Sequence, residues 1–204
     1  MFLLVPTELE AQPLKRMGLK PHVIGMGPVE AALGAYSLFL EKGPGPAILA
    51  GIGGAYPGSG LAIGDLAFAT VEYFGDLGLC YCLLERDFVE NLPALKECSL
   101  RHPLLEKATL CLEEKFAIEC GPFVTVCCAT RDPKRGEILA LRHQGALIEN
   151  MEGFSVAMAA KRSGVLLLEL RAVSNLIAEP DAPWRVEEAL ERLGEALKWL
   201  EKNL

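Results

Sequence analysis

Two short segments, Glu149-Asn-Met-Glu-Gly-Phe-Ser-Val-Ala157 and Arg171-Ala-Val-Ser-Asn175, carry the strongest signal in this 204-residue sequence. One expected helix and one expected buried strand separate them. Glu152 stands where a loop passes into the helix, and a carboxylate there can accept hydrogen bonds from the two adjacent hydroxyls of a ribose. Asn175 stands at the carboxyl end of the strand, where open α/β sheets bind ligands, and its amide can donate to and accept from a heterocycle edge. The two segments therefore indicate a nucleoside pocket.

An ordinary structural role is open for each of these residues taken alone. Glu152 would then cap the first turn of the helix, and Asn175 would form a turn in a loop. The combination of the two segments, and not either residue by itself, favours the pocket.

Together the segments resemble the nucleoside phosphorylase and nucleosidase family, which includes methylthioadenosine/S-adenosylhomocysteine nucleosidases and purine nucleoside phosphorylases. In that family a Met-Glu pair opens a long helix, and an Arg-Ala-x-Ser-Asp/Asn segment follows a strand. Met151-Glu152 and the segment from Arg171 to Asn175 match these features. The resemblance implies that Met151 packs on the sugar, Glu152 binds the ribose hydroxyls and Asn175 faces the purine. Ser174 is counted with the substrate-binding residues.

An acidic pair, Glu8 and Glu10, follows the first apolar run of the chain. Such a pair is usually the solvated start of a helix. By the resemblance, Glu10 matches the acidic residue that orients and deprotonates the attacking water in the family's nucleosidases, whereas Glu8 falls two residues early. Glu10 and Asn175 are thus the predicted catalytic residues.

Two glycine-rich turns border the expected site. In the turn Gly25-Met-Gly27-Pro28, a strand passes into a helix whose exposed amides could hold an anion, although a tight turn into a packed helix explains it equally well. Gly53 and Gly54 follow a buried strand, and glycines let the backbone approach a flat ligand closely. The resemblance places the amides of Gly53 and Gly54 along the base and the sugar.

A polar loop, residues 128–132, follows a later expected strand. It lies where the resembled family places its purine-contacting loop. Ala129, Thr130 and Arg131 are candidate base contacts by position, and Thr130 is counted with the substrate-binding residues. Arg131 is equally well explained as a surface charge.

The residue at position 175 narrows the class of purine that the substrate is expected to carry. Adenine-releasing members of the resembled family carry an aspartate there, whereas the amide of Asn175 can donate to O6 or N7 of a 6-oxopurine such as hypoxanthine. The continuation from Ser174 to Trp184, with Asp181 between them, resembles the futalosine hydrolases, which release hypoxanthine from futalosine in menaquinone biosynthesis. An adenosine-type nucleosidase or a purine nucleoside phosphorylase is the enzymatic alternative. A non-catalytic nucleoside-binding protein is the alternative of another class.

The arginines of the sequence bear on the choice of nucleophile. A phosphorylase needs cationic groups for a dianionic phosphate, and arginines beside the glycine turns usually supply them. No arginine lies between Arg16 and Arg86, although Arg86 could reach the site from a later strand. The pattern favours water over phosphate.

Apolar runs alternate with helical stretches along the chain, which is typical of a layered α/β fold, and we expect one domain over residues 1–204. The last helix is amphipathic and is expected to cover the sheet. The resemblance implies a mixed, partly closed central sheet flanked by helices. The expected strands are residues 2–5, 46–52, 66–74, 122–128 and 165–173.

Charge and composition narrow the expected partners. The net charge of −7 argues against nucleic acid and anionic membranes, which select a basic face. No apolar stretch reaches about 18 residues and no basic segment precedes the first apolar run, so we expect a cytoplasmic protein without a membrane span or signal peptide. The seven cysteines and three histidines show no zinc-ligand spacing, so neither a metal nor another cofactor is expected. The resemblance implies a homo-oligomer.

Overall fold

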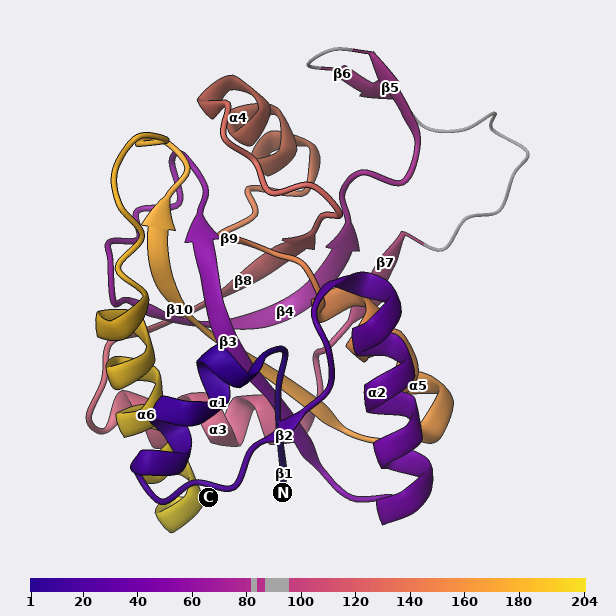
Figure 1. The fold of residues 1–204 in the computed structure, drawn as a ribbon, viewed down its shortest axis with the longest axis vertical. Coiled ribbons are helices and arrows are strands. Elements are labelled where there is room, and N and C mark those ends of the chain that lie inside the picture. Colours follow the sequence, from indigo (N-terminus) through magenta and orange to yellow (C-terminus); the bar gives the residue numbers. More distant parts are fainter. Residues whose placement is uncertain (82–83, 87–95) are drawn as a thin grey trace.

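The computed structural model describes residues 1–81, 84–86 and 96–204. A mixed sheet forms its centre, and helices cover both faces of the sheet (Figure 1). In chain order the elements are β1 (Phe2–Val5), α1 (Glu8–Arg16), β2 (His22–Val23), α2 (Gly27–Lys42), β3 (Ala47–Ala55), β4 (Leu66–Phe74), β5 (Leu79–Tyr81), β6 (Leu84–Arg86), β7 (Glu97–Ser99), α3 (Pro103–Glu113), β8 (Ile118–Thr125), α4 (Pro133–Arg142), β9 (Ile148–Asn150), α5 (Gly153–Ser163), β10 (Leu167–Leu176) and α6 (Val186–Asn203).

The main sheet is partly closed. Its strand order is β10-β4-β8-β9-β3-β1-β2, β7 pairs with β4, and β3 also pairs with β10. The five strands from β10 to β3 therefore close on one another, while β1 and β2 extend from β3. Strands β1 and β10 run parallel to β3, whereas β9 runs antiparallel to it, so the sheet is mixed.

Three neighbouring strands bring distant parts of the sequence to one edge of this sheet. β10 places Asn175 beside Gly54, and β9 places Glu149 on the other side of Gly54. The register between β3 and β10 shifts between Val173 and Asn175, so Ser174 is the extra residue of a β-bulge. Bulges re-aim side chains and are frequent beside active sites. This bulge lies at the end of β10 that carries Asn175.

Helices α2 and α5 pack against each other on one side of the sheet, and α1, α3 and α6 lie on the other side (Figure 1). The close approach of α2 to the backbone of Ile24, just after β2, depends on Gly34, because a Cβ atom there would overlap the carbonyl group of Ile24. The end of α5 is set by Gly164, whose left-handed backbone conformation terminates the helix. Neither of these two helical layers covers the carboxyl ends of β3 and β10.

Three apolar clusters hold these layers together. The first, which contains Phe39 and Val156, lies between the sheet and helices α2 and α5. The second, which contains Phe68 and Leu193, lies between the sheet and helices α1, α3 and α6. The third contains Leu139 and packs under α4. Each fully buried side chain of this kind contributes about 1.5–3 kcal/mol, so the clusters fix the frame on which the site residues stand.

One helix leaves an apolar face uncovered. Along α2 and its N-cap, Met26, Val29, Leu33, Tyr36 and Leu40 are between 41% and 70% exposed. Their spacings of three and four residues place them on one face of the helix. A continuous apolar face of this kind usually marks a protein–protein contact.

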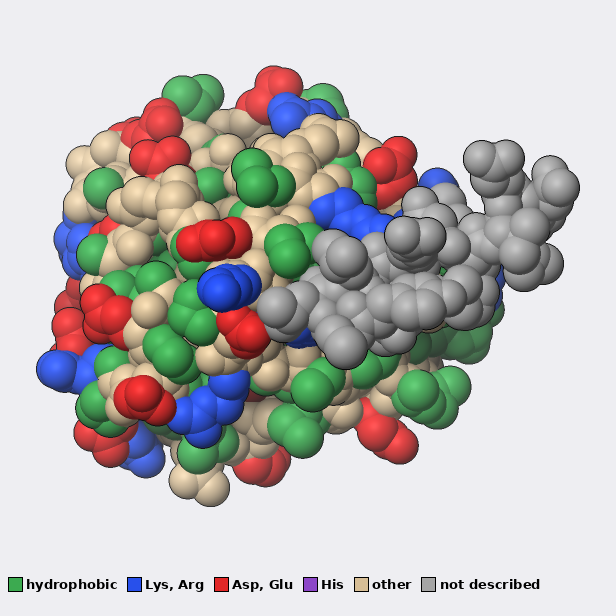
Figure 2. Space-filling view, turned by 90° about the horizontal axis from the view of Figure 1, so that it is seen from above, with side chains coloured by type: hydrophobic (Ala, Val, Ile, Leu, Met, Phe, Trp, Pro, Cys, Tyr) green, Lys and Arg blue, Asp and Glu red, His purple; other side chains and the backbone are tan. Residues whose placement is uncertain are grey.

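The surface elsewhere is mixed. On the face shown in Figure 2, acidic and basic side chains are interspersed among apolar ones. Within the described ranges, no helix is long and apolar enough to cross a lipid bilayer.

The expected fold class, an α/β chain with a mixed, partly closed sheet flanked by helices, is confirmed. All five expected strands are present, but three have other ends. β3 continues to Ala55, β8 spans Ile118–Thr125 instead of 122–128, and β10 spans Leu167–Leu176 instead of 165–173. Hydropathy marks where a strand is buried, whereas backbone pairing sets where it ends, and both β3 and β10 continue pairing through small or polar residues.

Candidate active site

One pocket at the edge of the sheet contains all the predicted site residues. They come from α1, β3, the loop before α4, the connection from β9 to α5, and β10. The eight residues are Glu10, Gly53, Gly54, Thr130, Met151, Glu152, Ser174 and Asn175. The structure brings them together, and their individual roles remain predictions.

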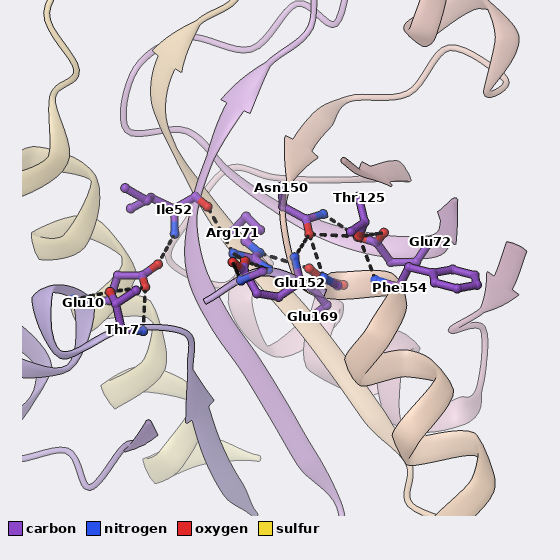
Figure 3. A network of polar contacts seen from close by, with 12 residues as sticks. Thr7, Glu10, Ile52, Glu72, Thr125, Asn150, Glu152, Phe154, Glu169 and Arg171 are labelled. Atoms are coloured by element: carbon purple, nitrogen blue, oxygen red, sulfur yellow. Dashed lines mark hydrogen bonds and ion pairs between the residues drawn. The ribbon is translucent and has the colours of Figure 1, made fainter. Parts of the chain in front are cut away.

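Glu10 reaches the pocket from the first turn of α1 (Figure 3). It forms a capping box with Thr7, whose amide and hydroxyl donate to Oε2 of Glu10 at 3.2 and 2.7 Å. The amide of Ile52 donates to Oε1 at 3.1 Å. The side chain of Glu8, in contrast, lies at the surface beside Lys15. Glu10 is therefore the member of the acidic pair that faces the pocket, and three hydrogen bonds hold its carboxylate in place.

Burial raises the pKa of Glu10 above its ordinary value of 4.5. The charge of Arg171 and the hydrogen bonds from Thr7 and Ile52 oppose this shift without cancelling it. A carboxylate with a raised pKa is a stronger base than a surface glutamate. The environment of Glu10 thus suits a group that accepts a proton from water.

Gly51 on β3 leaves the space that the side chains of Glu10 and Arg171 occupy. A Cβ atom at this position would lie 2.7 Å from Oε1 of Glu10 and 2.6 Å from Nη1 of Arg171. Both contacts are closer than real side-chain contacts, so the two charged groups leave room only for glycine.

Glu152 is the N-cap residue of α5, but its side chain does not cap that helix. Its Oε1 accepts from the amide of Gly27 at 3.1 Å, and its Oε2 lies 3.4 Å from Nη2 of Arg171. Asn150 caps the helix instead, because its Oδ1 accepts from the amides of Glu152 and Gly153 at 2.9 and 2.7 Å. The alternative in which Glu152 serves as a helix cap is therefore wrong, and its carboxylate lines the pocket.

The glycine turn before α2 binds a carboxylate of the protein itself, that of Glu152. Gly27 has a φ of 78°, a conformation that glycine adopts without strain, and its amide donates to Glu152. The start of α2 therefore adds helix-dipole stabilisation to the carboxylate of Glu152.

Arg171 supplies the buried positive charge of the site. Its side chain is 1% exposed, its Nε donates to Glu169 at 3.0 Å, and its Nη1 donates to the carbonyl oxygen of Ile52 at 3.2 Å. Burial lowers its pKa, but Glu169 and Glu152 raise the pKa by more, so the guanidinium stays charged. The sequence motif contains Arg171 without assigning it a role. Its position as a charged residue inside an apolar strand is the feature of the sequence that could have indicated a role.

Asn175 and Ser174 form a connected pair at the bulge of β10. Ser174 Oγ lies 2.9 Å from Oδ1 of Asn175 and 3.3 Å from the carbonyl oxygen of Gly53. When the hydroxyl donates to Oδ1, the Nδ2 group of Asn175 is left to donate to a ligand. A Cβ atom at Gly54 would lie 3.0 Å from that Nδ2 atom. Glycine at this position therefore keeps the amide accessible from the pocket.

Glu149 also lines the pocket, although it was not among the site residues predicted from the sequence. The amide and the hydroxyl of Thr130 donate to it at 2.7 and 2.6 Å, and the hydroxyl of Tyr56 donates at 2.9 Å. Burial raises the pKa of Glu149 above its ordinary value. Because Glu149 takes up both donors of Thr130, Thr130 lines the pocket without a free donor for a base.

Of the other two candidates in the polar loop, Ala129 and Arg131, only one lines the pocket. Ala129 lines the pocket. Arg131 does not, since its side chain is 76% exposed, donates to the carbonyl oxygen of Pro180 and lies 3.7 Å from Asp181. The surface-charge interpretation of Arg131 is thus the one that fits its position. The side chain of Arg86 lies outside the described residues.

Comparisons with known proteins give a consistent result. A protein-family model described as phosphorylase superfamily matches residues 21–202. The futalosine hydrolase of Thermus thermophilus is 33% identical over 213 residues, covering 97% of this chain and 93% of that protein. The futalosine hydrolase of Streptomyces coelicolor is 37% identical over 158 residues, covering 74% of this chain and 62% of that protein. The native structure of the Helicobacter pylori futalosine hydrolase has the same fold, with a TM-score of 0.84 at 20% identity over 99% of this chain and 97% of that chain.

Proposed function

Because the chain belongs to the phosphorylase superfamily, we propose that it is a nucleosidase that hydrolyses the N-glycosidic bond of futalosine. The products are hypoxanthine and dehypoxanthine futalosine, and the pathway is menaquinone biosynthesis. One observation carries the proposal: a single pocket holds a buried base candidate, a sugar-binding carboxylate and an amide in place of an acid at the purine position. The two curated relatives support the choice of substrate.

The proposed reaction breaks the bond between C1′ of the sugar and the purine nitrogen. Glu10 takes a proton from water, whose oxygen bonds to C1′ as the sugar passes through an oxocarbenium-like state. The purine leaves with the electron pair of the broken bond, while Nδ2 of Asn175 donates to it and stabilises its negative charge. The purine then takes up a proton from water or another group, and Glu10 releases its proton, which restores the starting charges. Glu152 and Met151 hold the sugar so that the attacking water and C1′ are aligned.

The charges of the pocket support water as the nucleophile. Among the described lining residues, the one arginine or lysine is Arg171, which is buried and engaged by Glu169 and Glu152. The amide of Gly27 donates to Glu152 and is therefore not free to hold phosphate. A phosphate dianion would meet the carboxylates of Glu10 and Glu152 here, which disfavours its binding.

Chromatography of the free base tests the proposal directly. The purified protein is incubated with futalosine, inosine and methylthioadenosine, each with and without phosphate. Phosphate-independent release of hypoxanthine from futalosine alone is the expected result. Adenine release would identify an adenosine-type nucleosidase, and a requirement for phosphate would identify a phosphorylase. No free base from any substrate would favour a nucleoside-binding protein without catalysis.

The raised pKa of Glu10 predicts an acid limb in the pH profile. Glu10 acts as a base only when deprotonated, so kcat/KM should fall about tenfold per pH unit below a pKa that lies above 4.5. Thr7→Val removes a hydrogen bond that lowers this pKa, so the limb should move to higher pH. Initial rates from pH 4 to 8 measure both effects. A rate that stays constant down to pH 4.5 would contradict the assignment.

The glycine between Glu10 and Arg171 offers a second prediction. Gly51→Ala should displace one or both charged groups and lower kcat/KM by up to about a hundredfold, since misplacement by about 1 Å can have that effect. Steady-state kinetics and urea unfolding measure activity and stability separately. Gly45→Ala is the control, because its Cβ would meet only the ring of Phe2. Equal rates in both variants would show that the spacing is unimportant.

We also propose that the protein is a homo-oligomer and that the apolar face of α2 forms its contact. This face begins at Met26, which also lines the pocket, so the contact would border the site. Leu33→Asp should then convert the oligomer to a monomer, as measured by sedimentation velocity. Leu110→Asp on α3, where the side chain is 65% exposed, should not. A monomeric wild-type protein would exclude this contact.

We also propose that the protein is located in the cytoplasm. Five described cysteines, Cys98, Cys111, Cys120, Cys127 and Cys128, are free thiols. Unpaired thiols are typical of reducing compartments. Fractionation of cells that express the protein, followed by immunoblotting, tests this location.

A further inference from the structure

Two buried carboxyl groups that the proposed mechanism does not use meet beneath the start of α5. They belong to Glu72 on β4 and Glu169 on β10, and both residues are 0% exposed. A Cβ atom at Gly153 would overlap an oxygen of Glu72 and lie 2.5 Å from an oxygen of Glu169. Oε2 of Glu169 is buried and has no hydrogen-bond partner among the described residues. Neither side chain lines the pocket, but each contacts a residue that does, Glu72 through Asn150 and Glu169 through Arg171 (Figure 3).

The charges around the pair do not balance unless a proton is present. In the described part of the site, one buried cation, Arg171, faces several carboxyl groups, and buried charges without partners are costly. Nε of Arg171 donates to Glu169, which places the negative charge there. Burial and then the charge of Glu169 raise the pKa of Glu72 well above its ordinary value of 4.5. The other titratable groups that interact with the pair are Glu152, Cys98 and Tyr56, and Glu10 interacts with Arg171.

We propose that Glu72 and Glu169 hold one proton between them at neutral pH, and that neutral Glu72 is a positioning residue for Glu152. The Glu72 hydroxyl then donates to Glu169. The part of the inference that concerns Glu152 rests on the proposed function, whereas the shared proton does not.

Glu72 controls the backbone of Glu152 through Asn150. Nδ2 of Asn150 donates to Glu72 at 2.6 Å, and Thr125 donates to the other oxygen of Glu72 at 2.7 Å. With its amide fixed in this way, Asn150 presents Oδ1 to the amides of Glu152 and Gly153. The neutral carboxyl group of Glu72 therefore holds the helix start from which Glu152 projects.

Glu169 controls the side chain of the same residue through Arg171. The guanidinium donates to Glu169 from Nε and reaches Oε2 of Glu152 from its other side. If Glu72 were also ionised, the pair would draw Arg171 away from Glu152. One shared proton thus leaves Arg171 placed between Glu169 and Glu152.

The pH dependence of unfolding tests the shared proton without any assay of activity. A carboxyl group whose pKa is raised in the folded state binds a proton that the unfolded chain has released. Stability is then lost as pH rises from about 4.5 to the folded pKa, and the unfolding equilibrium constant rises about tenfold per pH unit for one proton. Glu72→Gln carries no such proton. The wild type should therefore lose stability relative to Glu72→Gln by this factor across the window.

Matched controls separate this effect from other titrations. Glu119→Gln on β8 replaces an exposed glutamate and should follow the wild type at every pH. Parallel curves for the wild type and Glu72→Gln would overturn the shared proton. If Glu72→Gln does not fold, ¹³C NMR of glutamate carboxyl groups in the wild type decides the question. One carboxyl group still protonated at pH 7 is expected, and its absence would overturn the inference.

Substrate kinetics test the positioning role. Glu72→Ala leaves Asn150 without its partner and should raise the KM for futalosine about tenfold with a smaller change in kcat. Glu72→Gln, which can still accept from Asn150, should restore most of that loss. Equal KM values for the alanine variant and the wild type would exclude the role. A wild-type protein that binds no nucleoside would overturn the proposed function and leave the unfolding result to decide the shared proton.

Discussion

Replacing Glu10 by glutamine is expected to lower kcat for futalosine hydrolysis by about 10²- to 10⁴-fold, the usual contribution of general acid–base catalysis. Glutamine has nearly the same shape and can still accept from the amide of Ile52 or from Thr7. It cannot take a proton from water. The loss should therefore appear in kcat, while KM changes little, because Glu152 and Asn175 supply the sugar and base contacts.

Hypoxanthine release at saturating substrate measures kcat, and calorimetric titration of the variant with futalosine measures binding. Glu8→Gln is the matched control, since its carboxylate lies at the surface beside Lys15. This control should keep the wild-type rate. Normal turnover by Glu10→Gln would remove Glu10 as the base and direct attention to Glu149, a further buried carboxylate in the pocket.

Much of the fold and the site could be predicted from the sequence because the relevant signals are local. Apolar runs marked β1, β3, β4, β8 and β10, since a buried strand needs a continuous apolar segment. The short motifs around Glu152 and Asn175 each combine a polar residue with the end of a helix or strand. Such residues come together because neighbouring strands of one sheet end at the same edge, as β3 and β10 do.

The hydrogen-bond partners could not be predicted, because they depend on strand order and on long-range contacts. Nothing near Glu152 indicates that its carboxylate binds the amide of Gly27, which is 125 residues away. Likewise, Glu72 and Glu169 lie in separate apolar runs and meet only because β4 pairs with β10. A glutamate inside an apolar run was a visible signal in both cases, but the sequence alone did not supply its partner.

Changing Asn175 to aspartate is expected to lower kcat/KM for futalosine by about a hundredfold or more, the effect of losing one donor at a developing negative charge. Ser174 lies 2.9 Å from Oδ1 of Asn175, so the amide group that remains for the purine is Nδ2. In the variant, an acceptor replaces this donor. An ionised carboxylate would face the O6 acceptor of hypoxanthine and repel the leaving purine as its charge develops.

Two further variants show how much of this loss in kcat/KM comes from repulsion between the new carboxylate and the purine. Asn175→Ala removes the donor without adding a charge, so it should retain more futalosine hydrolysis than Asn175→Asp at neutral pH. Ser174→Ala leaves the amide free to turn over, so it should weaken the preference for 6-oxopurines over 6-aminopurines. Inhibition of futalosine hydrolysis by free hypoxanthine and by free adenine gives this preference for each protein. An unchanged 6-oxopurine preference in Asn175→Asp would show that another group reads the base, and Glu149, which adjoins Gly54 on the opposite strand, would be the first residue to test.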